Sequence, residues 1–405
     1  MTIADRNPQQ GPFGLRSPSG LAVQVNANCS IRRMDQGAIL LNLFLGNALE
    51  GGPANLYLRR LGEPVEAIPL LGPRSPARVG RDGNRLTLSG LWQRIRFKVT
   101  LTLAESAPAW FWHVTLENTG DQAVTLDLIH TQDLALAHYV AVRLNEYYVS
   151  HYLDHAPLRH RERGWVLATR QNLSMGGSHP WCLIGALGEC VSFATDALQV
   201  YGLGGRAGGL PAVLRDGLPG VRRQHEHGMA ALQDAPVELP PGGRAVRGFF
   251  GWFEPDHPAV TSDADLALVE RTLGLPEAAE PAVTVAVGWP SGASLFGSAP
   301  LLEAQDLTDA AVFALFGTRL REPEREEGRL LSFFVDERTH VALKAKELQV
   351  LRPHGQILRT GGGLTPDESA LTTTCWMAGV FHSMVTQGHV SINRLLSTTH
   401  GYLGL

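Results

Sequence analysis

The chain is poor in charged residues and in long apolar runs. Only 18% of its 405 residues are charged, the 35 Lys and Arg are outnumbered by 39 Asp and Glu, and the formal net charge is -4. Without a basic excess, the sequence argues against binding to nucleic acid or to an anionic membrane surface. No stretch of 18 apolar residues is present, so we expect no transmembrane helix.

Cysteine is scarce as well. The four cysteines form no Cys-x-x-Cys pair, and they are Cys29, Cys182, Cys190 and Cys375. The first residues contain no basic segment followed by an apolar run, so we expect no signal peptide. Reduced and mostly buried thiols in a cytoplasmic protein are the resulting prediction.

Strong catalytic motifs are also missing, since the sequence contains no G-x-S-x-G, Walker A or H-E-x-x-H pattern. The glycine-rich segment 202–209 resembles a phosphate loop but lacks its strand-to-helix context, so we expect a surface loop. His225 and His227 would share one face of a strand, as two metal ligands do, yet no third ligand is near. We therefore predict two half-exposed imidazoles and no metal site.

Paired carboxylates for glycoside cleavage are not identifiable by spacing. Such chemistry needs two Asp or Glu side chains that converge on a cleft. Four acidic residues are candidates by type alone, and they are Asp133, Glu146, Asp154 and Asp336. Nothing in the sequence brings any two of them together, so no catalytic residue is assigned.

What the chain has in quantity is turn residues, with 44 Gly and 25 Pro. Short apolar or alternating runs lie between them, and residues 94–103 alternate with the period of two of a half-buried strand. Residues 109–131 predict a hairpin that turns at 118–122. So many strands without helical interruption favour a mainly β fold of two stacked antiparallel sheets.

The pattern changes after this β-rich part. A Ser/Asp start followed by spaced apolar residues predicts a short helix within 261–275, and residues 302–317 predict a second helix. Residues 321–328 read as a charged, proline-bearing loop, after which strand patterns return. Near the end of the sequence, Ser391 is placed to cap a last helix.

The densest mixture of polar and aromatic side chains lies at 145–155. If this segment is a strand, alternate residues share a face, and tyrosine rings beside amide and imidazole groups suit a sugar. The alternative is a sheet whose tyrosines pack across strands with their hydroxyls in water, which the residue types alone favour. Polar insertions at 168–172 and 352–356 admit the same two interpretations. The candidate carbohydrate contacts are Asn145, Tyr147, Tyr148, His151, Arg170, Asn172, Arg352 and His354.

Several long segments, taken in order, resemble one known family. They are "LLNLFLGNALEGGPANLYLR", "HTQDLALAHYVAVRLNEYYVSHYLDH", "LATRQN", "LLSFFVDERTHVALKAKELQVLRPHGQIL" and "LTTTCWMAGVFHSMVTQGHVSINRLLS". Together they resemble the N-terminal part of the glycoside phosphorylases of glycoside hydrolase family 94. Within that family the match is to the 1,2-β-oligoglucan phosphorylases, and the phosphorylase region of cyclic β-1,2-glucan synthases looks similar too.

The resemblance implies a large, galactose mutarotase-like super-sandwich, then a helical linker, an (α/α)6 barrel and a small C-terminal sheet. On this basis we expect a flexible lead at 1–16, a sandwich domain at 17–385 with a helical and loop insertion at about 262–328, and the start of a helical linker at 386–405. A barrel of about a dozen helices, at ~11–12 residues each, exceeds the remaining length. The expectation is a truncated chain without the catalytic Asp of the family, with four exposed apolar residues near its end: Leu395, Leu396, Tyr402 and Leu403.

The chemistry implied by the resemblance is phosphorolysis. Inorganic phosphate, as co-substrate, attacks the anomeric carbon with inversion while an acid protonates the leaving oxygen, giving α-glucose 1-phosphate. No metal or organic cofactor is implied. The implied partner is a β-1,2-glucan or another β-glucooligosaccharide.

Three roles are compatible with these observations. The first is the N-terminal sandwich part of a 1,2-β-oligoglucan phosphorylase-like enzyme, inactive alone, which supports a barrel region in cis or in trans, within one chain or across a homodimer. The second is a free-standing carbohydrate-binding sandwich. The third is a mutarotase-like or lyase-like enzyme that uses His151 or His225 as acid or base.

Overall fold

The computed structural model describes residues 13–26, 29–46, 51–72, 74–82, 85–202, 211–223, 227–281, 309–326, 329–335 and 339–342. The chain divides into two compact units. The first contains residues 1–200 and 212–297, and the second contains residues 201–211 and 298–405.

Two sheets build the described part of the first unit. The smaller has the order β1-β2-β3-β4-β12, and its strands are Phe13–Arg16, Leu21–Val25, Ile31–Gln36, Ile39–Leu40 and Ala137–His138. The larger has 14 strands in the order β6-β5-β11-β17-β16-β14-β15-β19-β10-β9-β8-β7, while β13 pairs with β14 and β18 with β11. Its strands, in chain order from β5 and without β12, are Ala54–Leu61, Glu66–Pro69, Arg78–Asp82, Arg85–Trp92, Ile95–Leu103, Ala109–Asn118, Val124–Asp133, Leu153–His160, Gly164–Gln171, Trp181–Ala186, Cys190–Asp196, Gly228–Asp234, Val237–Leu239 and Arg244–Glu254.

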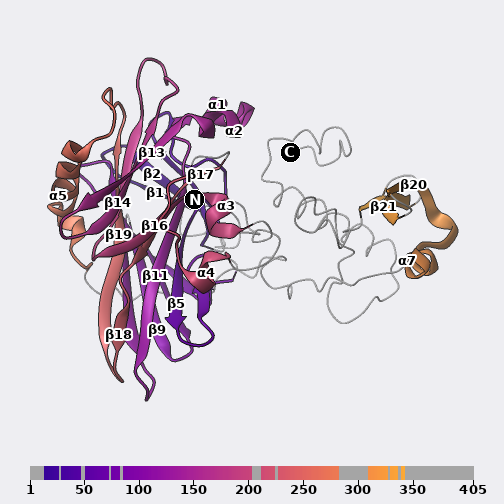
Figure 1. Ribbon diagram of the computed structural model, residues 1–405, viewed down its shortest axis with the longest axis horizontal. Helices are drawn as coiled ribbons and strands as arrows, with labels where there is room; N and C mark the ends of the chain where they lie inside the picture. Colours follow the sequence, from indigo (N-terminus) through magenta and orange to yellow (C-terminus); the bar gives the residue numbers. More distant parts are fainter. Residues whose placement is uncertain are drawn as a thin grey trace, which may run out of the picture. The chain divides into compact units, whose positions relative to one another are not determined.

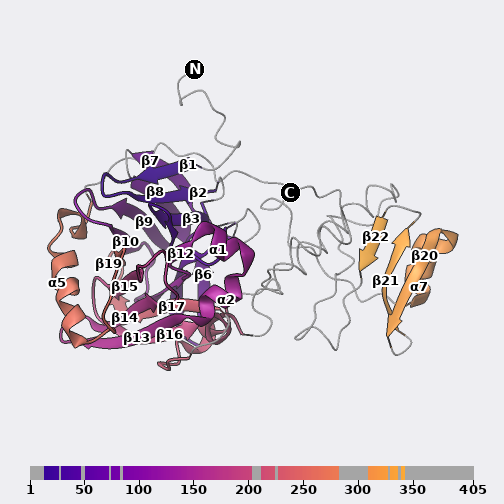
Figure 2. The ribbon, with the colours of Figure 1, turned by 90° about the horizontal axis from the view of Figure 1, so that it is seen from above.

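The large sheet curls, as Figure 2 shows for the arc of strands from β8 through β9, β10, β19 and β15 to β14. Its strand pairings are antiparallel except for the single contact of Gly164 with Cys190 between β14 and β16. The helices are short, the longest described one being α7 (Asp309–Phe316). The prediction of a mainly β, antiparallel two-sheet sandwich with a few short helices is therefore confirmed.

The predicted hairpin at 109–131 is wrong, although both of its strands exist. β10 pairs with β9 and β19, whereas β11 pairs with β5, β17 and β18, so the two strands are not neighbours. The connection between them crosses between two separate positions of the large sheet, since β17, β16, β14, β15 and β19 lie between β11 and β10 in the strand order. A strand pattern with a turn looks the same for a hairpin and for such a crossing, because the pairing partner β19 lies far away in the sequence.

Asn118 fixes this crossing. Its buried side-chain amide donates to the carbonyl oxygens of Gln122 (2.7 Å) and Leu239 (3.0 Å), and its Oδ1 accepts from the N–H of Gly120 (2.9 Å). The Asn118 backbone N–H also donates to Gly243 O (2.9 Å). One side chain thus ties the end of β10 to the turn and to the end of β18.

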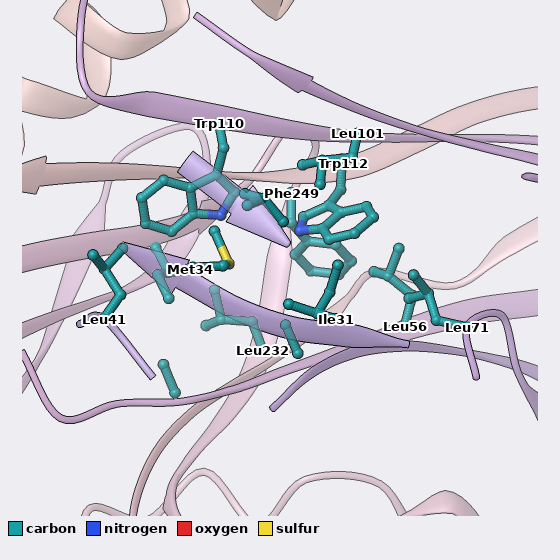
Figure 3. Close-up of a cluster of buried hydrophobic side chains, with 14 of the residues drawn as sticks. Ile31, Met34, Leu41, Leu56, Leu71, Leu101, Trp110, Trp112, Leu232 and Phe249 are labelled. Carbon is teal, nitrogen blue, oxygen red and sulfur yellow. The ribbon is translucent and has the colours of Figure 1, made fainter. Parts of the chain in front are cut away.

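The main core lies between the two sheets. Both sheets contribute to a single cluster of buried residues, with Ile31 and Met34 from β3 facing Trp110, Trp112 and Phe249 from β10 and β19 (Figure 3). These five side chains are 0% exposed. Burial of such large apolar groups provides the main stabilisation of the unit, at about 1.5–3 kcal/mol for each fully buried side chain.

A second core lies on the other face of β10, β14, β15 and β19. There the helical segment packs against the sheet through Val269 of α5 (Ala267–Leu273), which contacts the cluster containing Phe111, Trp181 and Phe250 (Figure 1). The 3₁₀ helix Asp263–Leu266 precedes α5, and Ser262 caps it in a reciprocal arrangement with Asp265. The short helix predicted within 261–275 is thus confirmed.

The described part of the second unit contains helix α7 (Asp309–Phe316), a 3₁₀ turn Gly317–Arg319, and a three-stranded antiparallel sheet. The sheet has the order β20-β21-β22, with strands Leu320–Glu326, Arg329–Val335 and Thr339–Ala342. The helix and the return of strands confirm the predictions for these stretches.

The predicted loop at 321–328 is wrong, because most of it forms β20. Pro323 lies where the register shifts between Arg321 and Glu324, on an edge strand, so its missing N–H breaks no ladder hydrogen bond. The expected last helix and the four apolar residues predicted to be exposed lie outside the described residues. Among the described helices, none combines the length and hydropathy needed to span a bilayer.

Candidate functional site

Residues 146–151 of the tyrosine-rich segment form a helix, so the strand arrangement considered for this segment does not apply to them, while a strand begins at Leu153. α1 (Tyr139–Leu144) is followed directly by α2 (Glu146–His151), and Asn145 separates them. The Asn145 side chain accepts a hydrogen bond from the N–H of Tyr148 at 3.1 Å and so caps α2. In the sequence, Asn145 directly before the six helical residues is the signal for a helix start. The alternation of polar and aromatic residues in the same segment resembles a strand pattern and hides this signal.

The helical period places some side chains of α2 on a buried side and others on an exposed side. Val149 and Ser150 are buried, each 1% exposed, and the Ser150 hydroxyl oxygen accepts from the N–H of Gly228 at 2.6 Å. This bond anchors α2 to the start of β17. Residues on the opposite side of the turn are therefore held outward on a fixed backbone.

Tyr148 and Tyr152 are the outward pair. Their rings are 48% and 37% exposed, their centroids lie 5.0 Å apart at an interplanar angle of 62°, and the Tyr152 hydroxyl donates to that of Tyr148 at 3.2 Å. This hydrogen bond, and then the charge of the Tyr148 phenolate, raise the pKa of Tyr152. Tyr152 was not among the predicted contacts, although a spacing of four residues is the helical signal for such a pair.

A charged pair lies just beyond the tyrosines. Asp154, the second residue of β13, accepts from the Arg222 guanidinium at 2.6 Å. The next residue of β13, His155, is buried, and its Nδ1 lies 2.9 Å from the hydroxyl oxygen of Thr169. Burial, and then the positive charge of Arg222, lower the pKa of His155 to about 3, so this imidazole is neutral and serves as a packed core group.

Arg170 and Asn172 lie at the end of β14, and the structure uses both to join segments of this unit. The Arg170 guanidinium donates to the carbonyl oxygens of His257 (2.7 Å) and Pro258 (3.2 Å) and also to Asn172 Oδ1. The Asn172 N–H donates to Tyr152 O at 2.9 Å. Arg170 is only 9% exposed, whereas the Asn172 side chain is exposed near the tyrosine pair.

The remaining predicted contacts have different outcomes. His151 ends α2 and is exposed, whereas the side chain of Tyr147, like Arg352 and His354, lies outside what the structure describes. His225 lies outside the described residues as well. His227 lies just before β17, with its Nε2 3.7 Å from Asp133 Oδ2 and its ring edge-on to Phe44 at 4.7 Å.

The acidic candidates do not form a pair on the described surface. Asp133 is buried beside His227, and Asp154 is bound to Arg222, so each has its own basic neighbour. Asp336 and the Glu146 side chain are outside the described set. Among described residues, no three His, Cys, Asp or Glu side chains gather as metal ligands. The site therefore presents the exposed rings of Tyr148 and Tyr152, with the hydrogen-bonding side chain of Asn172 nearby.

Three of the four cysteines lie among the described residues. Cys29, Cys182 and Cys190 are buried and form no disulfide bond. Burial raises the pKa of all three thiols, to about 12 for Cys29 and Cys190, so none forms the reactive thiolate near neutral pH.

Comparison with known proteins gives this geometry a context. The SOGP N-terminal domain model matches residues 24–251, and the glycoside phosphorylase supersandwich domain model matches residues 316–405. A 1,2-beta-oligoglucan phosphorylase from Listeria innocua serovar 6a is 30% identical over 360 residues, which is 88% of this chain. The match covers 31% of that relative, so the chain spans about a third of its length.

Solved structures are similar at a lower level. A galactose mutarotase related enzyme from Lactobacillus acidophilus has 9% identity and a TM-score of 0.34, over 62% of this chain and 100% of that one. A bacterial glucoamylase has 8% identity and a TM-score of 0.40, over 65% of this chain and 34% of that one. Such values say nothing about activity. The SOGP N-terminal domain model matches more than half of the sequence. The chain therefore belongs to the SOGP N-terminal domain family and is a region of the N-terminal type found in glycoside phosphorylases like those of glycoside hydrolase family 94.

Proposed function

We propose that this chain is the β-sandwich part of a phosphorylase that cleaves β-1,2-glucooligosaccharides, and that this part does not catalyse the reaction by itself. In that reaction a phosphate oxygen bonds to the anomeric carbon, the glycosidic C–O bond breaks, and the leaving oxygen takes a proton. The sandwich holds and positions the catalytic region, in the same chain, in a second chain or across a homodimer. No group other than phosphate is needed as co-substrate.

The observation that carries the proposal is the order and extent of the matches. Two domain models of phosphorylase type follow one another along the sequence, and the phosphorylase relative is similar over 88% of this chain. The two acidic candidates that the structure describes, Asp133 and Asp154, each lie beside their own basic residue and not beside each other, which is in keeping with a non-catalytic role for this part. A cytoplasmic location is part of the proposal, in keeping with the lack of a disulfide bond at the three described cysteines.

A chimera tests this function. The chain replaces the matched region of the Listeria innocua relative, and glucose 1-phosphate release from β-1,2-glucooligosaccharides and phosphate is measured for the chimera and for the chain alone. We expect release by the chimera and none by the chain. Release by the isolated chain would place catalysis within it, and a folded but inactive chimera would show that it does not replace the matched region.

A second candidate function is a carbohydrate-binding sandwich, which the exposed pair Tyr148 and Tyr152 favours. Aromatic rings held on an anchored turn can stack on the CH face of a sugar with little ordering cost. Calorimetric titration of the chain with β-1,2-glucooligosaccharides separates this role from pure scaffolding. Binding that Tyr148→Ala weakens at least about tenfold supports the role, and binding unchanged by that substitution removes it.

A further inference from the structure

A cavity in the first unit is used by none of the features above. It has a volume of about 350 Å³ and lies between α3 (Ala197–Tyr201), α4 (Val213–Asp216) and the segment 217–223. This volume is within the range of ~300–1,000 Å³ typical of small-molecule sites. The cavity is open to solvent, since Leu198 and Val221 in its walls are 48% and 47% exposed.

The wall formed by 217–223 is fixed to the large sheet. Val221 forms a parallel bridge with Ala194, and the Thr195 hydroxyl both accepts from Arg223 N–H (2.7 Å) and donates to Arg223 O (2.5 Å). The N–H of Gly220 donates to Phe193 O at 2.9 Å. This wall is therefore preformed.

The α3 wall is joined to the first wall by one side chain. The Gln199 amide donates to Val221 O (2.9 Å), and its Oε1 accepts from the N–H of Thr195 (3.1 Å). Asp196, which is 1% exposed, accepts from the Leu198 N–H at 2.8 Å and holds the first turn of α3. Because both walls are set before any ligand arrives, binding has little conformational cost.

The lining combines apolar side chains with charged groups of both signs. Leu198 and Val221 contribute exposed apolar surface, and the exposed residues Asp216 and Arg223 contribute a carboxylate and a guanidinium. Asp196 adds a second carboxylate, and Arg215, which pairs with Asp216 at 3.0 Å, adds a second guanidinium, so the charges around the cavity balance and do not favour a phosphate ester. Hydrogen bonding to Arg215 lowers the pKa of Asp216, so it accepts hydrogen bonds throughout the neutral range.

We propose that this cavity binds one hexose unit of a neutral oligosaccharide. The sugar CH groups lie on Leu198 and Val221, while its hydroxyls donate to Asp216 and accept from Arg223. The preference for a neutral polyol follows from the cavity alone. The choice of a β-1,2-linked glucan as probe rests on the proposed function.

The chain offers a matched set of variants for the test. Asp216→Asn and Arg223→Gln change the lining. Asp121→Asn changes an exposed carboxylate in the turn after β10. Circular dichroism confirms that each variant is folded, and two independent lining variants guard against the loss of one.

The experiment is calorimetric titration of the 405-residue chain with a β-1,2-linked glucotriose and, separately, with glucose 1-phosphate. We expect binding of the triose that weakens at least about tenfold in both lining variants and stays unchanged in Asp121→Asn, with weaker binding of glucose 1-phosphate. No binding, equal loss in Asp121→Asn, or loss only in Tyr148→Ala overturns the proposal. An active chimera together with absent triose binding would reject this site while leaving the proposed function intact.

Discussion

The Arg59 guanidinium and the Asp127 carboxylate form a two-pronged ion pair across neighbouring strands of the large sheet. Arg59 Nε lies 2.8 Å from Oδ1 and Nη2 lies 2.5 Å from Oδ2, and both residues are almost fully buried. Gln233 of β17 donates to the same carboxylate at 2.9 Å, and Arg59 also donates to Leu214 O of α4 at 3.4 Å. The pair therefore links β5, β11, β17 and α4.

Removal of one partner of this pair should be costly. We expect Arg59→Met to lower the free energy of unfolding by about 3–5 kcal/mol, because Asp127 remains as a buried, uncompensated charge. Arg59→Met/Asp127→Leu should recover much of the loss. Urea denaturation measures both. Arg60→Met, at the next position on the half-exposed face, is the control and should change stability by about 0.5 kcal/mol or less. Equal effects at positions 59 and 60 would contradict this view.

The crossing between β10 and β11 depends on one side chain. Asn118→Ala removes three hydrogen bonds to backbone groups, so we expect a loss of about 2–3 kcal/mol in the free energy of unfolding. Gln122→Ala in the same turn keeps the carbonyl that Asn118 binds and should be near neutral. Thermal unfolding of both variants decides the matter, and a stable Asn118→Ala protein would show that the crossing does not need this residue.

Buried histidine makes stability depend on pH. Burial lowers the pKa of His130 from its ordinary 6.5 to about 3, and its ring stacks on Phe249 with centroids 5.1 Å apart. The unfolded chain therefore binds the proton more readily, and the contribution of His130 is complete above pH ~6.5 and is lost as the pH falls. His130→Phe should remove a slope of up to about 1.4 kcal/mol per pH unit between pH ~6 and ~4.

The measurement is urea unfolding of both proteins over that pH range. Asp234 contributes the opposite slope, because burial raises its pKa from 3.8 to about 7 and its stabilising effect is lost as the pH rises. Only the difference between wild type and His130→Phe isolates the histidine. Identical slopes for the two proteins would refute the assignment.

A glycine in β19 makes room for a tryptophan. A Cβ at Gly251 would lie 2.0 Å from the ring of the fully buried Trp110, its cross-strand neighbour. Gly251→Ala should therefore destabilise the fold by about 1–3 kcal/mol through overpacking. At Gly188 the nearest atom to a new Cβ is 3.5 Å away, so Gly188→Ala should not destabilise. Comparison of the two melting temperatures tests the close approach.

Local patterns in the sequence predicted the strands and the short helix after Ser262, because periodicity and capping act within a few residues. They did not reveal that β10 pairs with β19, since no local signal encodes a distant partner. At 145–155 the sequence left the element open, and the strand arrangement considered there does not hold for residues 146–151. The capping bond of Asn145 and the burial of Val149 favour a helix, which turns Tyr148 and Tyr152 to the same side.

The sequence also names Arg170 and Asn172 at the end of β14 as candidate contacts, but it cannot show which of the two side chains is available to bind a sugar. Arg170 and Asn172 are the polar types that a sugar requires, and the sequence does not show that Arg170 is bound by the carbonyl groups of residues 257 and 258. Such contacts depend on a segment almost ninety residues later, which only the folded chain brings near.

The separation of β10 from β11 has a consequence for how this protein is made on the ribosome. β10 needs β19 as one of its two neighbours, so the curled sheet cannot close until Glu254 has left the exit tunnel. Until then Trp110 and Trp112 lack the β19 side of their core, and the nascent chain presents an unpaired strand edge. The pairing of strands far apart in the sequence thus leaves this edge of β10 unpaired throughout the interval of synthesis between β11 and β19.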